Sequence, residues 1–215
     1  MIAIRETPPV DVRATEQTRR RYERLSAYYD LLEGLAERRY RSWRQRLWSR
    51  VLGRRVLEVG VGTGKNMPYW PSGLSITAID LTPGMVAQAR RRSEQLGLNP
   101  DLRLGDVQAL DFPAASFDTA VATFVFCSVP DPVRGLRELA RVVRPGGQIL
   151  LLEHLRPDNP LLAGMTDVLS PIVVQLIGAN LNRRTLDNAR LAGLDVIRVE
   201  ELAMAGMYRL ITAQS

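Results

Sequence analysis

The chain has 215 residues, of which 46% are hydrophobic and 24% are charged, and its net charge is +6. This composition is typical of a one-domain globular protein, and a single cysteine, Cys127, excludes an internal disulfide framework. One cysteine and one histidine give no zinc-ligand spacing, so we expect no metal. Residues 1–10 do not resemble a signal peptide, so we expect a cytoplasmic protein, with peripheral contact to the inner membrane face left open.

Almost all of the excess positive charge lies in the first 50 residues. Residues 1–50 carry 12 arginines against 7 acidic residues, a balance of +5. One explanation is a solvated helical surface, and another is a basic amphipathic helix that touches anionic lipid. No nucleic-acid motif accompanies the charge, so we expect no nucleic-acid partner.

Residues 14–52 have the periodicity of two helices, with a break expected at Gly34. Each helix has an apolar stripe, formed by Tyr22, Leu25, Tyr29 and Leu32 in the first and by Tyr40, Trp43, Leu47, Trp48 and Val51 in the second. Aromatic side chains beside arginines suit either packing on the main domain or contact with a membrane interface. Residues 12–52 are therefore the candidate membrane surface.

From residue 54 onward, predicted strands alternate with predicted helices. Apolar runs predict strands at 55–59, 75–79, 117–123, 147–152, 195–200 and 207–213, and helical periodicity predicts helices at 84–96, 132–143 and 183–192. Such alternation indicates an α/β fold with a doubly wound, mostly parallel sheet. We expect one compact unit, in which residues 1–53 form a basic helical cap on a domain of residues 54–215.

A glycine-rich turn follows the first predicted strand. Gly60, Gly62 and Gly64 alternate directly after that strand. Glycine lets a ligand approach the main chain closely, and a strand that enters such a turn before a helix typically receives a nucleotide-like cofactor. Lys65 stands where the dinucleotide fingerprint G-x-G-x-x-G needs its last glycine. The spacing therefore favours S-adenosylmethionine (SAM) over NAD.

Acidic residues end the first three predicted strands. Asp80 ends the second strand, where a carboxylate can accept hydrogen bonds from ribose hydroxyls, and Leu81 and Met85 could line an adenine. Gly105-Asp106-Val107 ends a further predicted strand, the third in chain order, where Asp106 can accept a hydrogen bond from the adenine amino group. Glu58 would hold the turn or neutralise the methionine ammonium. These side chains form the predicted cofactor set.

Residues 57–64, Ile79-Asp80, Gly105-Asp106, Phe117-Asp118 and Arg144-Pro145-Gly146-Gly147 resemble the class I SAM-dependent methyltransferases. The resemblance covers about residues 55–155 and implies a seven-stranded sheet, with SAM over the glycine turn and S-adenosylhomocysteine as product. It implies cofactor roles for Glu58, Gly60, Gly62, Gly64, Asp80, Asp106 and Val107, and we add Asn66 and Thr123. A SAM-binding protein without catalysis is the alternative of another class.

Two groups within this superfamily are similar over further segments. Arg21-Tyr22 and Tyr29-Asp30 resemble the N-terminal helix of bacterial phosphatidylethanolamine N-methyltransferases and quinone C-methyltransferases, which folds over the cofactor. Lys65-Asn66, residues 126–130, Glu153-His154 and residues 178–181 resemble vertebrate alkyl-thiol methyltransferases, which are membrane-associated. Both resemblances imply a lipophilic acceptor. The first choice is the phosphatidylethanolamine amine, and a quinone ring or a small alkyl thiol is the alternative.

The candidate catalytic residues are Tyr22, Tyr29 and His154. The two tyrosines could accept hydrogen bonds from an ammonium substrate or make cation–π contact with it. His154 could act as a base or as a structural hydrogen-bonding residue. Cys127 is expected as a small wall residue of the substrate site.

Residues 160–179 are almost wholly apolar, with Asp167 as their one charge and Pro171 in the middle. The proline and the charge argue against a membrane-spanning helix. We expect an apolar lid over the acceptor, formed by Met165, Leu169, Ile172, Val173 and Leu176, with a dimer contact as the alternative. Arg183 and Arg184 could grip a lipid phosphate, and Asn182 could cap the next helix. The acceptor atom, the number of methyl transfers and the oligomeric state stay open.

Overall fold

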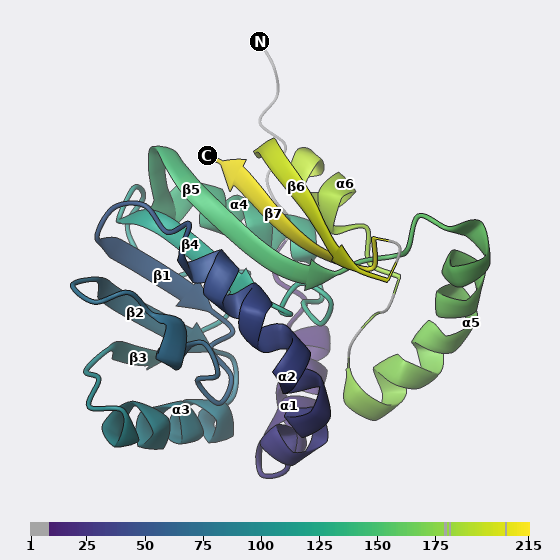
Figure 1. The fold of residues 1–215 in the computed structure, drawn as a ribbon, viewed down its shortest axis with the longest axis horizontal. Coiled ribbons are helices and arrows are strands. Elements are labelled where there is room, and N and C mark those ends of the chain that lie inside the picture. The colour runs from purple at the N-terminus through teal and green to yellow at the C-terminus, as the bar shows by residue number, and fades with distance from the viewer. Residues whose placement is uncertain (1–8, 179, 181, 205) are drawn as a thin grey trace.

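A seven-stranded sheet forms the centre of the computed structural model, which describes residues 9–178, 180, 182–204 and 206–215 (Figure 1). The strands are β1 (Arg55–Val59), β2 (Ser75–Asp80), β3 (Asp101–Leu104), β4 (Phe117–Thr123), β5 (Val143–His154), β6 (Asp195–Ala203) and β7 (Tyr208–Gln214). Their order is β3-β2-β1-β4-β5-β7-β6, and β7 alone runs antiparallel to its neighbours β5 and β6. The predicted seven-stranded, mostly parallel sheet is confirmed.

The strand order reverses between β1 and β4, which lie side by side. The chain first winds outward through β2 and β3 and then crosses back to β4, so the connections after β1 and β4 leave in opposite directions. In open α/β sheets a ligand binds outside the carboxyl ends of the strands at such a point.

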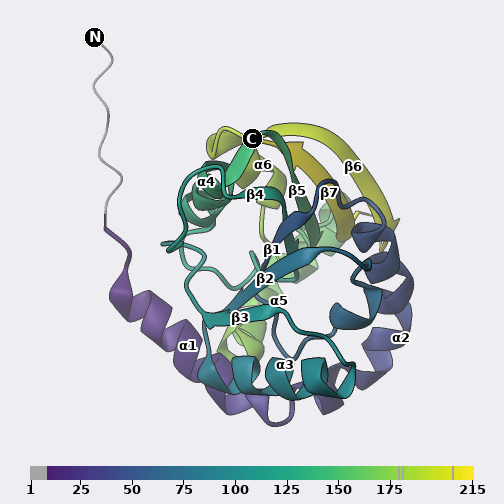
Figure 2. The same cartoon turned by 90° about the vertical axis from the view of Figure 1, so that its left-hand side faces the viewer.

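Helices cover both faces of the sheet (Figure 2). The helices are α1 (Val12–Ser26), α2 (Tyr29–Trp48), α3 (Pro83–Gln95), α4 (Pro132–Val142), α5 (Pro160–Ile177) and α6 (Thr185–Leu191), with a 3-10 turn, η1 (Met67–Tyr69). α4 and α6 pack on the face that includes Leu57 and Leu151, whereas α2 packs on the face of Val56 and Leu150. The alternation of apolar side chains along each strand therefore supplies two cores.

The aromatic stripe of α2 belongs to the protein interior. Trp43, Leu47 and Trp48 are all buried and pack with sheet residues such as Val56 and Leu150. Of the two alternatives for these side chains, packing on the domain therefore applies. Lipid contact through them would require α2 to leave the sheet.

The break between the first two helices lies at Ala27 and Tyr28, so the prediction of a break at Gly34 is wrong. Gly34 continues α2, at a cost of about 1 kcal/mol relative to alanine. The break falls where α1 meets α3: Ser26 is buried, and Glu23 accepts a hydrogen bond from the main-chain N–H of Gly84 at 3.0 Å. The side chain of Leu32, predicted in the stripe, lies outside the described side chains.

α5 lies at one side of the molecule in Figure 1, beyond the edge of the sheet. Asn159 caps its start by accepting from the N–H groups of Leu161 and Leu162, and Gly178 ends it in the left-handed conformation at φ +82°. The side chains of Ile172 and Leu176 lie outside those that the structure describes. Across the described ranges, no helix is both long and apolar enough to cross a membrane.

Candidate active site

The glycine turn after β1 is shaped by backbone angles that favour glycine. Gly60 has φ +65° and Gly62 has φ +56°. A Cβ on Gly60 would lie 2.4 Å from Cγ2 of Val125, whereas a Cβ on Gly62 would meet no heavy atom within 4 Å. The main chain at Gly62 therefore forms a cradle that a side chain would fill and that a ligand can approach.

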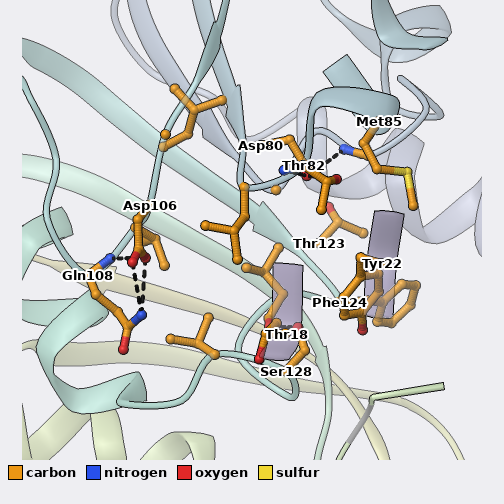
Figure 3. Close-up of a pocket in the computed structure, with 18 of the residues that line it drawn as sticks. Thr18, Tyr22, Asp80, Thr82, Met85, Asp106, Gln108, Thr123, Phe124 and Ser128 are labelled. Carbon is orange, nitrogen blue, oxygen red and sulfur yellow. Dashed lines mark hydrogen bonds between the residues drawn. The ribbon is translucent and has the colours of Figure 1, made fainter. Parts of the chain in front are cut away.

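A cavity opens beside this turn at the carboxyl ends of the parallel strands (Figure 3). The space between its walls is about 740 Å³ when the open solvent at its mouth is included. The predicted cofactor residues that line it are Gly60, Gly62, Asp80, Leu81, Met85, Asp106, Val107 and Thr123. The residues present therefore fit a nucleoside cofactor.

Asp80 joins the end of β2 to the glycine turn. Its Oδ2 accepts a hydrogen bond from the N–H of Gly62 at 2.9 Å, and its Oδ1 accepts from the N–H and the hydroxyl of Thr82 at 3.0 and 2.8 Å. Burial raises the pKa of this carboxyl, while these hydrogen bonds lower it. The carboxylate is thus held at the cavity wall, where the ribose assignment requires it.

Gln108 holds the second carboxylate of the cavity, and sequence reasoning missed it. This buried side chain donates to Asp106 at 3.1 Å and to the hydroxyl of Thr15 at 3.0 Å, and it accepts from the N–H of Asp131 at 2.9 Å. It therefore connects α1 and the start of α4 to Asp106. A glutamine two residues after that aspartate was the signal available in the sequence.

Glu58 lies under the turn and is not among the residues that line the cavity. Its carboxylate accepts from the amide of Asn66 at 2.7 Å and from the indole N–H of Trp70 at 2.9 Å. Burial raises the pKa of Glu58 to about 7. Of the two roles considered for it, these contacts support holding the loop.

Asn66 and Gly64 shape the same loop from two sides. Asn66 also donates to the hydroxyl of Thr123 at 3.0 Å and accepts from Arg44 at 2.8 Å, and it lines a smaller pocket next to the cavity. Gly64 lines neither pocket: a Cβ there would lie 2.8 Å from the side chain of Met67. Gly64 therefore permits close packing under the loop.

Tyr22 and Tyr29 reach the cavity from the helical cover. Both line it, and Tyr22 is drawn in Figure 3 among the side chains of its wall. The neighbour of Tyr29, Asp30, accepts from the hydroxyl of Thr63 at 2.6 Å and pairs with Arg92. This pairing fixes the start of α2 against the glycine turn, so the expected cover lies over the cofactor cavity.

Phe124 forms the wall between the cavity and a cluster of aromatic rings. Its φ of +57° is unusual for a bulky residue and costs about 1–3 kcal/mol. The ring contacts Tyr40, with centroids 4.8 Å apart, and Tyr208 at 6.2 Å. His154 lies 6.1 Å from Phe124 and does not line the cavity, so the structure places this predicted base behind the wall.

Glu153 and Arg183 hold the loop that follows Phe124. Oε1 of Glu153 accepts from the N–H groups of Val125 and Phe126 at 2.9 and 3.0 Å, and burial raises the pKa of Glu153 to about 7. Arg183 donates to the carbonyl of Val129 at 2.7 Å from the other side. Its guanidinium therefore supports the loop and lines a separate pocket outside the cofactor cavity, so its predicted contact with a lipid phosphate stays a prediction.

Cys127 and Arg184 also lie away from the cavity. Cys127 is buried, its Sγ lies 3.4 Å from the carbonyl of Phe124, and its neighbour Ser128 lines the cavity in its place. The thiol lies within 4.8 Å of a carboxylate oxygen of Glu153 and a ring nitrogen of His154. Arg184 is exposed in a separate, arginine-rich pocket.

The cavity wall includes further residues to which the sequence analysis assigned no role of their own. Beyond Gln108 and Phe124, they are Thr18, Ile79, Thr82, Gly105, Val125, Ser128, Val129 and Pro130. Most come from the connections after β2, β3 and β4, and Thr18 comes from α1. Most of these residues lie in loops, and loops lack the hydrophobic periodicity from which helices and strands are predicted. The sequence therefore contains no pattern that marks them as part of the cavity.

Comparison with protein families and curated relatives agrees with this geometry. Residues 57–151 match the family model described as a methyltransferase domain. The chain is 43% identical over 120 residues to a phosphatidylethanolamine N-methyltransferase of Cereibacter sphaeroides, an alignment that covers 55% of this chain and 59% of that protein. It is 31% identical over 173 residues to the ubiquinone/menaquinone biosynthesis C-methyltransferase UbiE of Hahella chejuensis, covering 74% and 68%.

Solved structures show the same fold. A [4+2]-cyclase, SpnF, superposes with a TM-score of 0.76 at 19% identity, covering 94% of this chain and 96% of that one. A SAM-dependent methyltransferase of Thermotoga maritima, described as a possible histamine N-methyltransferase, has a TM-score of 0.70 at 23% identity and covers 91% and 98%. The sheet order, the glycine cradle and the sequence relatives agree: this chain belongs to the class I SAM-dependent methyltransferases, and its cofactor is SAM.

Proposed function

We propose that the chain transfers methyl groups from SAM to a lipophilic acceptor, in the first place the amino group of phosphatidylethanolamine and its partly methylated products. The observation that supports this acceptor best is the 43% identity to a phosphatidylethanolamine N-methyltransferase. The alignment covers about three fifths of that relative, so the acceptor is inferred for this chain.

The side chains at the cavity suit an amine acceptor. Bound SAM supplies an electrophilic methyl group, so the protein has to place the acceptor in line with it and exclude water. Tyr22 and Tyr29 line the cavity from the helical cover, and Phe124 lines it from the end of β4. The rings of Tyr29 and Phe124 already face cations of the protein, Nζ of Lys65 at 5.4 Å and the guanidinium of Arg44 at 5.8 Å. The ring of Tyr22 can hold an ammonium by cation–π contact, and the tyrosine hydroxyls can accept its protons in hydrogen bonds.

A turnover assay tests this proposal. Purified protein is incubated with SAM and vesicles that contain phosphatidylethanolamine, and both S-adenosylhomocysteine and methylated lipid are measured by mass spectrometry. We expect mono- and dimethylated lipid to form with S-adenosylhomocysteine in proportion. SAM binding without product from any acceptor would favour the non-catalytic alternative.

Quinone-ring methylation is the second candidate, because the UbiE relative aligns over 74% of this chain. A demethylated quinol in detergent is the matching substrate, and a small alkyl thiol completes the comparison. Methylation of the quinol or the thiol but not of phosphatidylethanolamine would overturn the first choice. Amine, thiol and quinol acceptors all lose a proton on methylation, so the identity of the methylated product, and not a tyrosine variant, separates these cases.

A further inference from the structure

α5 presents its apolar side to solvent and its polar side to the protein. An α-helix has about 3.6 residues per turn, so Leu161, Met165, Val168 and Leu169 share one stripe, which we call the outer face of α5. Leu161 is 81% exposed, Met165 59%, Val168 74% and Leu169 45%. A helix that packs on a core normally has the opposite arrangement.

The inner face of α5 consists of small and polar side chains. Ala163, Thr166 and Ser170 are all buried. The hydroxyl of Ser170 donates to the side chain of Asn182 at 3.1 Å, and the hydroxyl of Thr166 donates to the carbonyl of Ala163 at 2.9 Å. The contact with the domain therefore leaves the four large apolar side chains of the outer face in water, which calls for a partner.

Arginines gather in a pocket beside this helix. The arginine pocket is lined by Arg156, Arg183, Arg184, Arg190 and Arg209, and its two acidic side chains leave a net charge of +3. Nε of Arg209 is buried and has no hydrogen-bond partner in the described structure. Arginine binds phosphate oxygens through two parallel N–H donors, so a phosphate is the ligand that suits this pocket.

An ion pair places the arginine pocket next to α5: Arg156 pairs with Asp167 of α5 at 2.8 Å. This arginine, and to a smaller extent the charge of Arg184, lowers the pKa of Asp167. At the other end of the helix, Gly178 lies against Arg21 and Tyr22 of α1. Tyr22 lines the cofactor cavity, so the helix runs from the arginine pocket to the cover of that cavity.

We propose that the outer face of α5 docks on an anionic phospholipid surface, with the arginine pocket taking lipid phosphates. Charge complementarity favours lipid over a second copy of the chain, because the net positive pocket beside the helix matches anionic headgroups and not another basic protein surface. A helix in this position buries its apolar side chains at the boundary of headgroups and acyl chains, while nearby arginines contact the headgroups. This docking gives the proposed lipophilic acceptor a route to the cavity, but it does not depend on which acceptor is methylated.

Vesicle co-sedimentation without SAM tests the docking separately from turnover. The vesicles contain phosphatidylcholine and phosphatidylglycerol in equal parts, with pure phosphatidylcholine as the neutral comparison. Val168→Asp should weaken binding to the anionic vesicles at least about tenfold, because it replaces an apolar side chain that the docked helix would bury in the lipid with a charged one. Val12→Asp is the matched control, since Val12 is equally exposed at 74% but lies at the start of α1. We expect it to bind as the unchanged protein does.

A second variant tests the arginine pocket. Replacing Arg184 and Arg190 by alanine should weaken binding to anionic vesicles by about fivefold per arginine and leave binding to phosphatidylcholine unchanged. Every variant should keep the SAM affinity and the thermal midpoint of the unchanged protein, which shows that the fold is retained.

Three results would overturn the proposal. Val12→Asp could lose vesicle binding while Val168→Asp keeps it, which would move the docking to α1. Val168→Asp and Val12→Asp could both bind the vesicles as the unchanged protein does. Light scattering could find a dimer that Val168→Asp dissociates, which would make the outer face of α5 an interface between two copies.

Discussion

Because open space lies in front of Gly62, a substitution there can test cofactor binding separately from the stability of the fold. Gly62→Ala puts an L-residue at φ +56°, which costs about 1–2 kcal/mol. A more restricted unfolded chain offsets about 0.4–1 kcal/mol of this cost. No heavy atom lies within 4 Å of the new Cβ, so no steric clash is added. We expect a net loss of about 1 kcal/mol, seen as a melting midpoint lower by about 2–4 °C.

The effect on SAM should be larger, because the new methyl group projects into the cavity against which the cofactor lies. We expect the dissociation constant of SAM in titration calorimetry to rise at least about tenfold, or about 1.4 kcal/mol. Gly73→Ala is the matched control. Gly73 has φ +80° and equally open surroundings but lies outside the cavity, so it should lose the same stability and keep the SAM affinity.

Unchanged SAM affinity in Gly62→Ala, with the stability loss of the control, would refute the placement of the cofactor on this turn. Gly60→Ala supplies the opposite case. Its Cβ would lie 2.4 Å from Val125, so it should be far less stable than either variant. Equal stability of all three would contradict the steric argument itself.

Three further outcomes follow from the site. Asp80→Ala should weaken SAM binding at least about tenfold, because a charge-assisted hydrogen bond contributes about 1.5–3 kcal/mol. An unchanged affinity measured by calorimetry would contradict the assignment of Asp80 to the ribose. Glu58 and Glu153 have folded pKa values of about 7, raised from 4.5, so the stability they contribute below pH 4.5 is lost as the pH rises through 7. Glu153→Gln removes one of these titrations, so between about pH 5 and about pH 8 its free energy of unfolding should fall less than that of the unchanged protein, by up to about 3 kcal/mol. Urea titrations at both pH values measure this difference, and an equal fall in both proteins would argue against the raised pKa. Arg183→Met should slow methyl transfer more than it weakens SAM binding, because it frees the carbonyl of Val129; steady-state kinetics with SAM titration separates the two effects.

The cofactor half of the site could be predicted because its signals lie at strand ends. Parallel strands bring their carboxyl ends to one edge of the sheet, so Asp80 and Asp106 meet there although the sequence separates them. The glycines of the turn reveal their backbone angles by their identity alone. Glu58 shows the limit of this reasoning, since its position in the motif does not reveal that it faces the loop and not the ligand.

The acceptor half could not be predicted, because it depends on tertiary contacts. The left-handed backbone of Phe124 is unusual for a phenylalanine and is fixed by the loop that Glu153 holds. The break at Ala27 and Tyr28 depends on contacts of α1 with α3. The apolar run at 160–177 predicts a hydrophobic element, but only the fold shows that its apolar stripe points outward.

The solved relatives explain why the acceptor must be argued from these residues and not from the fold. A [4+2]-cyclase superposes over 94% of this chain, and cyclisation is not methyl transfer, so the shared sheet does not determine the reaction. What can differ among such proteins is the set of side chains on the far side of the cofactor. Here Tyr22 and Tyr29 from the cover and Phe124 from the end of β4 line the cavity, whereas α5 does not line it and meets the cover at Gly178. The proposal of a lipophilic acceptor therefore rests on the aromatic rings in the cavity and on the apolar surface that α5 exposes beside the cover.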